Sequence, residues 1–188
     1  MTNTMTDENT GTSYDLTGDT NFDFGDGNGS VPAHKHMNGG GWVAETASVD
    51  ASAFVGPEAL VYGEAQVYGE AQVCDKAQVC DKALVYGEAR VCEKALVCGE
   101  ARVCGEARVY GEARVCTTPI LLTGYEFAIT ICDNQMQVGC KTIMQSVELS
   151  ADLFPEEQCP RLRTAATLII HIIKAHWDYC KDRGSACA

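Results

Sequence analysis

The chain lacks both a concentration of positive charge and a long hydrophobic segment. Of its 188 residues, 14 are Lys or Arg and 26 are Asp or Glu, so the net charge is −12. Binding to a phosphate backbone needs clustered basic side chains, which argues against a nucleic-acid partner. The longest apolar run, residues 168–173, is far shorter than the roughly 18 residues that a membrane-spanning helix needs. We therefore expect neither nucleic acid nor membrane as a partner.

The sequence also has little that points to export or to a metal site. Residues 1–22 contain neither a basic start nor an apolar stretch, so they do not resemble a secretory signal. We therefore expect a cytoplasmic protein whose 11 cysteines stay reduced and act mainly as small packing residues. No two cysteines have the CxxC spacing of a zinc ribbon, and no metal ligand set is predicted.

A repeat of six residues dominates the middle of the chain. A valine occurs at every sixth position from Val43 to Val115, thirteen in succession, and an alanine follows four residues after each of the first twelve. In a helix, six residues turn through about 600°, so these valines would not share a face. Six is, however, a multiple of the two-residue period of a strand. The repeat therefore predicts short strands separated by corners, with valine and alanine facing the same side.

The hexad, Val-x-Gly-Glu-Ala-x as in residues 61–66, resembles that of the hexapeptide-repeat proteins. This resemblance covers about 40% of the chain. It implies a left-handed parallel β-helix with three strands in each 18-residue coil, and association as a trimer with parallel axes. The hexad spacing alone does not determine the hand.

Two further segments, residues 38–43 and 129–140, resemble uncharacterised hexapeptide-repeat proteins of phages and prophages. This resemblance implies a phage protein that acts in the cytoplasm of a host cell. Such proteins often carry a histidine and an acidic-Trp pair soon after the Gly-Cys of the second segment. Here residues 141–144, Lys-Thr-Ile-Met, follow instead, so a function tied to those residues is not implied.

Coils of 18 residues would arrange outward side chains in columns on three faces. The first face carries Trp42, Leu60, Gln78, Leu96 and Arg114 beside Ala44, Tyr62, Cys80, Cys98 and Cys116. The second carries Ser48, Gln66, Leu84 and Arg102 beside Asp50, Tyr68, Tyr86 and Cys104, and the third carries Phe54, Gln72, Arg90 and Arg108 beside Gly56, Cys74, Cys92 and Tyr110. The first face is the most apolar. We therefore expect the trimer interface there, formed by Leu60, Tyr62, Cys80, Leu96 and Cys98.

The segments on either side of the repeat differ from it in composition. Residues 1–37 are acidic and rich in Thr, Asp, Asn and Gly, which predicts a disordered segment before the β-helix of residues 38–121. Within residues 122–188, apolar alternation on both sides of Asp133 predicts a β-hairpin. A helix is expected from residue 156, with His176 and Cys180 on its packed side. Hairpin and helix would form a small α+β cap.

The histidine positions bear on the class of function. Hexapeptide-repeat acyltransferases generally use a histidine as general base, and the carbonic anhydrases of this fold use three coil histidines as metal ligands. This chain has no histidine from residue 37 to residue 170, and His176 is interpreted as a core residue. We therefore expect a non-catalytic trimeric binding or scaffold protein without a cofactor. The alternative is a coenzyme-A-dependent acyltransferase.

Arginine and tyrosine side chains on two faces are the candidate ligand-binding residues. Arg90 and Arg108 would stack beside Tyr110 on the third face, and Arg102 would lie near Tyr86 on the second. Charge-assisted hydrogen bonds and ring stacking favour a small anionic, nucleotide-like ligand at clefts between subunits. A phage protein of this kind would act as a sponge for such a ligand or as a decoy for a host defence protein. The same arginines also fit interface salt bridges or solubilising charge.

Overall fold

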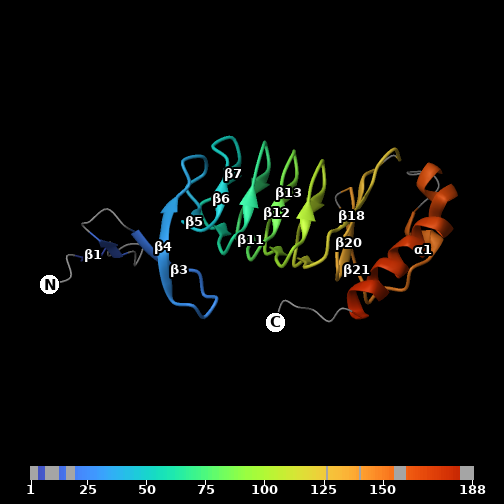
Figure 1. Cartoon of the computed structure of the whole chain (residues 1–188). Helices are drawn as coiled ribbons and strands as arrows, with labels where there is room; N and C mark the ends of the chain where they lie inside the picture. The colour runs from blue at the N-terminus through green and yellow to red at the C-terminus, as the bar shows by residue number, and fades with distance from the viewer. Residues whose placement is uncertain are drawn as a thin grey trace.

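The protein is described by a computed structural model that covers residues 4–6, 13–15, 20–125, 127–139, 141–154 and 160–182. The repeat winds into a parallel β-solenoid of about four turns. Figure 1 shows the coils as a column, with the N-terminal strands at one end and an antiparallel sheet and a helix at the other. None of the described helices is long and apolar enough to cross a bilayer.

Parallel pairing between coils confirms the predicted circumference of 18 residues. Val61 pairs with Val79, and Val79 with Val97. The first face consists of β5 (Trp42–Ala44), β8 (Leu60–Val61), β11 (Gln78–Val79), β14 (Leu96–Val97) and β17 (Arg114–Val115). The second consists of β6 (Ser48–Val49), β9 (Gln66–Val67), β12 (Leu84–Val85) and β15 (Arg102–Val103). The third consists of β7 (Phe54–Val55), β10 (Gln72–Val73), β13 (Arg90–Val91) and β16 (Arg108–Val109).

The interior of the solenoid is made of the repeated valines and alanines. From Ala53 to Val115, every repeat valine and alanine is at most 2% exposed. The strands are only two residues long, so the ladder is completed by bonds on either side of each valine. The Leu60 N–H donates to the Ala77 carbonyl, and the Tyr62 N–H to that of Val79, each at 3.0 Å. The core is thus thin, and each coil depends on the backbone of its neighbour.

The corners require a left-handed backbone. At nine successive corners, from Gly63 to Gly111, the second residue after valine has a positive φ. Six of these residues are glycine, which adopts this conformation without the steric cost of a Cβ atom. The other three are Asp75, Asp81 and Glu93, with φ of 54°, 58° and 65°. Charged side chains beyond the corners pair along the axis as their 18-residue spacing allows: Lys76 with Glu58, and Lys94 with Glu112.

Part of the N-terminal segment belongs to the fold. The strands β1 (Thr4–Thr6), β2 (Ser13–Asp15), β3 (Thr20–Asp23) and β4 (Ser30–Lys35) extend the first-face sheet, and β4 pairs antiparallel with β5. The composition predicts no fixed structure here. Aromatic contacts supply the reason for the difference, because the Phe22 ring stacks on Trp42 at 4.5 Å and the Phe24 ring on Tyr62 at 5.1 Å.

An antiparallel sheet and a helix close the other end. The sheet contains β18 (Ile120–Leu122), β19 (Ile129–Ile131), β20 (Gln135–Val138) and β21 (Lys141–Met144), so it has two strands more than the predicted hairpin. A 3-10 turn, η1 (Ala151–Leu153), precedes the helix α1 (Pro160–Asp182). One face of the helix is apolar and buried: Leu162, Ala166, Ile169 and Ile173 pack against Ile129, Ile131, Met136 and Phe154.

The cysteines of the coil depart from the expectation of reduced thiols. Cys74 and Cys92 occupy the same column on the third face and form a disulfide, with Cα atoms 4.6 Å apart. On the first face, the sulfur atoms of Cys98 and Cys116 lie 3.1 Å apart. Stacking at one-coil spacing brings cysteines of a column within the Cα separation that a disulfide needs. The thiol columns are therefore capable of cross-linking as well as packing.

Candidate functional site

The arginines and tyrosines predicted to bind a ligand lie on two faces of the solenoid. Arg90 and Arg108 are paired directly between β13 and β16, with exposed side chains, and Tyr110 follows β16. Arg102 lies on the second face, as does Tyr86. Hydrogen bonding to Cys104 raises the pKa of Tyr86. The structure therefore brings together two arginines and one tyrosine on the third face, but not all five residues.

Four of the five residues predicted for the trimer interface line a hollow on the first face. This hollow of about 510 Å³ is bounded on one side by the loop between β3 and β4. Its lining comprises Asp26, Asn28, Tyr62, Gly63, Gln78, Cys80, Asp81, Leu96, Cys98 and Arg114. Leu60 does not line it, because that side chain packs with the β3–β4 hairpin. The first face is thus partly covered by the chain itself and partly open.

Two side chains that line the hollow have raised pKa values. Burial raises the pKa of the Cys80 thiol to about 11, and it also raises the pKa of the Tyr62 hydroxyl, with the neighbouring Cys80 adding to the effect. Both side chains therefore stay neutral near pH 7. The charged residue types in its lining are Asp26, Asp81 and Arg114.

A second group of polar side chains lies at the seam between the last coil and the cap. Asp133 lies in the turn between β19 and β20. It occupies the place that the backbone of a further coil would take in the ladder of hydrogen bonds between coils. Its Oδ2 atom accepts hydrogen bonds from the N–H groups of Cys116 at 2.8 Å and Thr117 at 3.2 Å. Its Oδ1 atom accepts the Thr117 hydroxyl proton at 2.6 Å. This carboxylate therefore satisfies backbone donors that would otherwise end the sheet unpaired.

Two side chains of α1 meet Asp133 from the opposite side. His176 and Cys180 are one helical turn apart, so they share a face of the helix. The Cys180 sulfur lies 3.5 Å from His176 Nε2 and 3.6 Å from Asp133 Oδ1, and Nε2 and Oδ1 are 4.0 Å apart. We call Asp133, His176 and Cys180 the seam cluster. Its three heteroatoms could hold a metal ion.

Burial shifts the pKa values of the two helix residues of the seam cluster. Burial lowers the pKa of His176, although Asp133 acts in the opposite direction. Burial also raises the pKa of the Cys180 thiol, a shift that the Thr117 hydroxyl partly offsets. Both shifts favour the neutral forms of the two helix side chains near pH 7.

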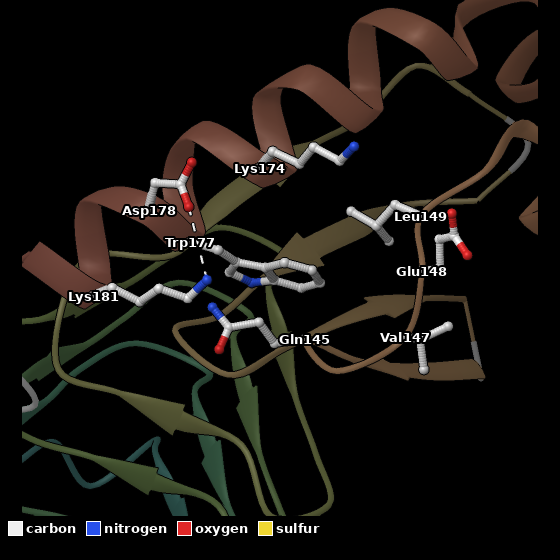
Figure 2. Close-up of a pocket in the computed structure, with 8 residues that line it drawn as sticks. All are labelled: Gln145, Val147, Glu148, Leu149, Lys174, Trp177, Asp178 and Lys181. Atoms are coloured by element: carbon white, nitrogen blue, oxygen red, sulfur yellow. Dashed lines mark ion pairs between the residues drawn. The ribbon is translucent and has the colours of Figure 1, made fainter.

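A smaller hollow lies between α1 and the loop after β21. Figure 2 shows the Trp177 ring between the helix and Gln145, with Lys174 and the Lys181–Asp178 ion pair along the helix. Its volume is about 270 Å³. The Gln145 Nε2 group is buried there without a hydrogen-bond partner. Trp177 itself donates from Nε1 to the Cys132 carbonyl at 2.9 Å, which fixes the helix beside the turn that carries Asp133.

The fold defines a β-solenoid protein with a capped end. Comparison of the chain with family models, with curated proteins and with solved structures finds no match.

The seam cluster was not predicted from the sequence as a group. His176 was predicted on the packed side of the helix and is indeed buried. Asp133 was predicted only as a turn residue, and its contact with the helix spans more than forty positions. The available signal is the spacing of His176 and Cys180, four residues apart in an amphipathic helix, which puts two metal-ligating groups on one face.

Proposed function

We propose that the chain is a non-catalytic binding or scaffold protein that associates as a homotrimer through the first face of its solenoid. The coil is left-handed in this proposal, as the resemblance to hexapeptide-repeat proteins implies. The observation that carries the proposal is the open hollow on the first face. Leu96, Cys80 and Cys98 line it on successive coils of a rigid column. Cys80 and Cys98 are already buried in the single chain, so the half-buried Leu96 and Tyr62 side chains supply the apolar surface that a second copy would cover.

The proposed ligand is small and anionic, and it binds at the clefts between subunits. Arg90 and Arg108 are stacked on successive coils with exposed side chains, and no ion pair with a carboxylate is found for either within the described residues. Two guanidinium groups at one-coil spacing repel each other, so an anion between them would be stabilised. A phage protein with this property would sequester a nucleotide-like signal in the host cytoplasm, or would engage a host protein as a decoy.

Native mass spectrometry of the full chain tests the oligomeric state. Leu96→Asp introduces a charge into the hollow, whereas Gln72→Asp introduces the same charge on the third face at the equivalent position before valine. Because neither side chain points into the core, both variants should fold. We expect a trimer for the wild type and Gln72→Asp, and a monomer for Leu96→Asp. A monomeric wild type, or a trimeric Leu96→Asp, would contradict the proposal.

The same spectra test the ligand and the alternative class. A trimer that retains a nucleotide-like mass, and loses it in Arg108→Gln, supports the binding role. The opposing result is turnover of acetyl-coenzyme A, measured with a thiol reporter and abolished in His176→Ala. That result would make the protein an acyltransferase.

A further inference from the structure

We propose that the seam cluster binds one zinc ion, with Asp133 Oδ1, His176 Nε2 and Cys180 Sγ as its three protein ligands. Zinc prefers this set of atoms, because it is a borderline-soft ion that accepts carboxylate oxygen, imidazole nitrogen and thiolate sulfur. The site goes beyond the proposed binding function and does not depend on it.

Two of the three distances between these atoms are those of a tetrahedral site. Bonds of about 2.0–2.3 Å from zinc to oxygen, nitrogen and sulfur separate neighbouring ligand atoms by about 3.3–3.6 Å. The sulfur of Cys180 is 3.5 Å from His176 Nε2 and 3.6 Å from Asp133 Oδ1. The remaining separation, 4.0 Å between Nε2 and Oδ1, needs a closure of about 0.6–0.7 Å. Small rotations of the side chains supply that much.

The carboxylate is oriented before any ion binds. Asp133 Oδ2 is held by the N–H groups of Cys116 and Thr117, so the other oxygen is directed toward the helix. The Trp177 hydrogen bond to the Cys132 carbonyl holds α1 next to this turn. Outer contacts that fix the ligands are a general feature of metal sites, since they reduce the cost of ordering on binding.

The same three residue types also occur in cysteine-nucleophile triads, but the geometry here differs. In a triad, one imidazole nitrogen faces the nucleophile and the other faces the carboxylate. In the seam cluster, both Cys180 and Asp133 approach the Nε2 atom of His176. Convergence of three donors on one point is the arrangement of ligands around an ion rather than that of a proton relay.

Three protein ligands leave one coordination position for water or for the Thr117 hydroxyl. Thr117 Oγ1 lies 2.6 Å from Asp133 Oδ1 and 3.2 Å from the Cys180 sulfur, at the edge of the cluster. Bound zinc would join α1, which carries His176 and Cys180, to the β19–β20 turn, which carries Asp133 and is hydrogen-bonded to the end of the last coil. Zinc is therefore expected to stabilise the docking of the helix.

Cobalt substitution in the purified full chain tests the site. The protein is stripped with a chelator and titrated with Co²⁺ under anaerobic conditions. We expect one ion per chain, a near-ultraviolet thiolate-to-cobalt band, and visible bands of tetrahedral intensity. One equivalent of Zn²⁺ should displace the cobalt and raise the melting temperature.

Two ligand variants and two matched controls decide the outcome. Changes to outer contacts alone weaken metal binding about 10–100-fold, so Cys180→Ala and His176→Gln should weaken it by about 100-fold or more. Cys104→Ala removes a half-buried coil thiol and His171→Ala an exposed helix histidine, and both should bind as the wild type does. Circular dichroism checks folding, and Cys180→Ala decides the case if His176→Gln is unstable. Wild-type cobalt binding without a thiolate band, or unchanged affinity in a folded ligand variant, overturns the proposal.

Discussion

Three corners have a residue other than glycine at the position of positive φ, and they provide a test of what stabilises the coil. Asp75, Asp81 and Glu93 have positive φ, a conformation that costs an L-residue roughly 1–2 kcal/mol relative to glycine. At two of these corners, a side-chain hydrogen bond offsets part of this cost. Asp75 Oδ2 accepts the Glu93 N–H at 3.2 Å, and Asp81 Oδ2 accepts the Gly99 N–H at 2.9 Å. For Glu93, whose side chain is longer, no hydrogen bond of this kind is found in the described part of the chain.

We therefore expect Glu93→Gly to stabilise the protein and Asp81→Gly to leave it unchanged or weaker. Removing the strain at Glu93 raises the free energy of unfolding by about 1–2 kcal/mol. The greater conformational freedom of glycine in the unfolded chain lowers it by about 0.5–1 kcal/mol. The net gain is about 0.5–1 kcal/mol, or roughly 2 °C in melting temperature for a chain of this size. At Asp81, the loss of a hydrogen bond worth about 0.5–1.5 kcal/mol cancels that gain.

Thermal unfolding followed by circular dichroism, at one fixed redox potential, measures the difference between the two variants. Gly87→Ala is the reverse control, because its Cβ atom would lie 3.2 Å from the backbone nitrogen of Gly105 and its φ is 75°. It should lower the melting temperature. Two results would contradict this explanation: a melting temperature of Glu93→Gly below that of the wild type, or equal shifts in the two glycine variants. Either result would mean that backbone strain, and its offset by an aspartate hydrogen bond, does not explain how Glu93 and Asp81 differ.

Two further predictions concern the cap. Asn134→Ala should cost about 1–2 kcal/mol, because its side chain accepts the Arg114 N–H and donates to the Glu112 carbonyl; urea unfolding measures the loss, and faster hydrogen exchange of the Arg114 amide locates it. Burial raises the pKa of Cys132 to about 12, so the folded state retains a proton that the unfolded state loses above about pH 9. The contribution of Cys132 to the free energy of unfolding should therefore be fully present below that pH. It should fall by up to about 1.4 kcal/mol per pH unit as the pH rises toward 12. The fall should be smaller in Cys132→Ala. An equal fall in both proteins would assign the effect to other groups.

The solenoid could be predicted from the sequence because its determinants are local and repeated. The valine and alanine of each hexad face the same side whatever lies elsewhere in the chain, and the pairing of Val61 with Val79 follows once three strands make a coil. The hairpin of β19 and β20 and the helix of the cap were predictable for the same reason, since their apolar periods are short, whereas β18 and β21 were not predicted. The hand of the coil is not contained in the spacing.

The N-terminal strands show where composition fails as a guide. Residues 20–35 have few apolar side chains, but Phe22 and Phe24 find ring partners on the first face. A segment poor in apolar residues becomes ordered when its few aromatic side chains meet a matching surface, because each such ring buries a large area. That surface is created by the coil, so it is not visible in the segment itself.

The seam cluster was harder to predict because it depends on how the helix docks. Asp133 and His176 are far apart in sequence, and neither carries a local motif that joins them. The spacing of His176 and Cys180 indicates a shared helix face, but it does not say what that face meets. The hydrogen bond from Trp177 to the Cys132 carbonyl answers that question, and it belongs to tertiary structure.

The last coil links the stability of the solenoid to the proposed metal site. An open β-solenoid end exposes a row of unpaired N–H and C=O groups, which favours end-to-end association. Here side chains of the cap take the place of the next coil: Thr130 accepts the Arg108 N–H, and Gln135 donates to the Tyr110 carbonyl. Asp133 does the same for Cys116 and Thr117 with one carboxylate oxygen, and it presents the other to the helix. Closing the ladder therefore fixes one of the three ligand atoms in advance, and docking of the helix brings the other two to it.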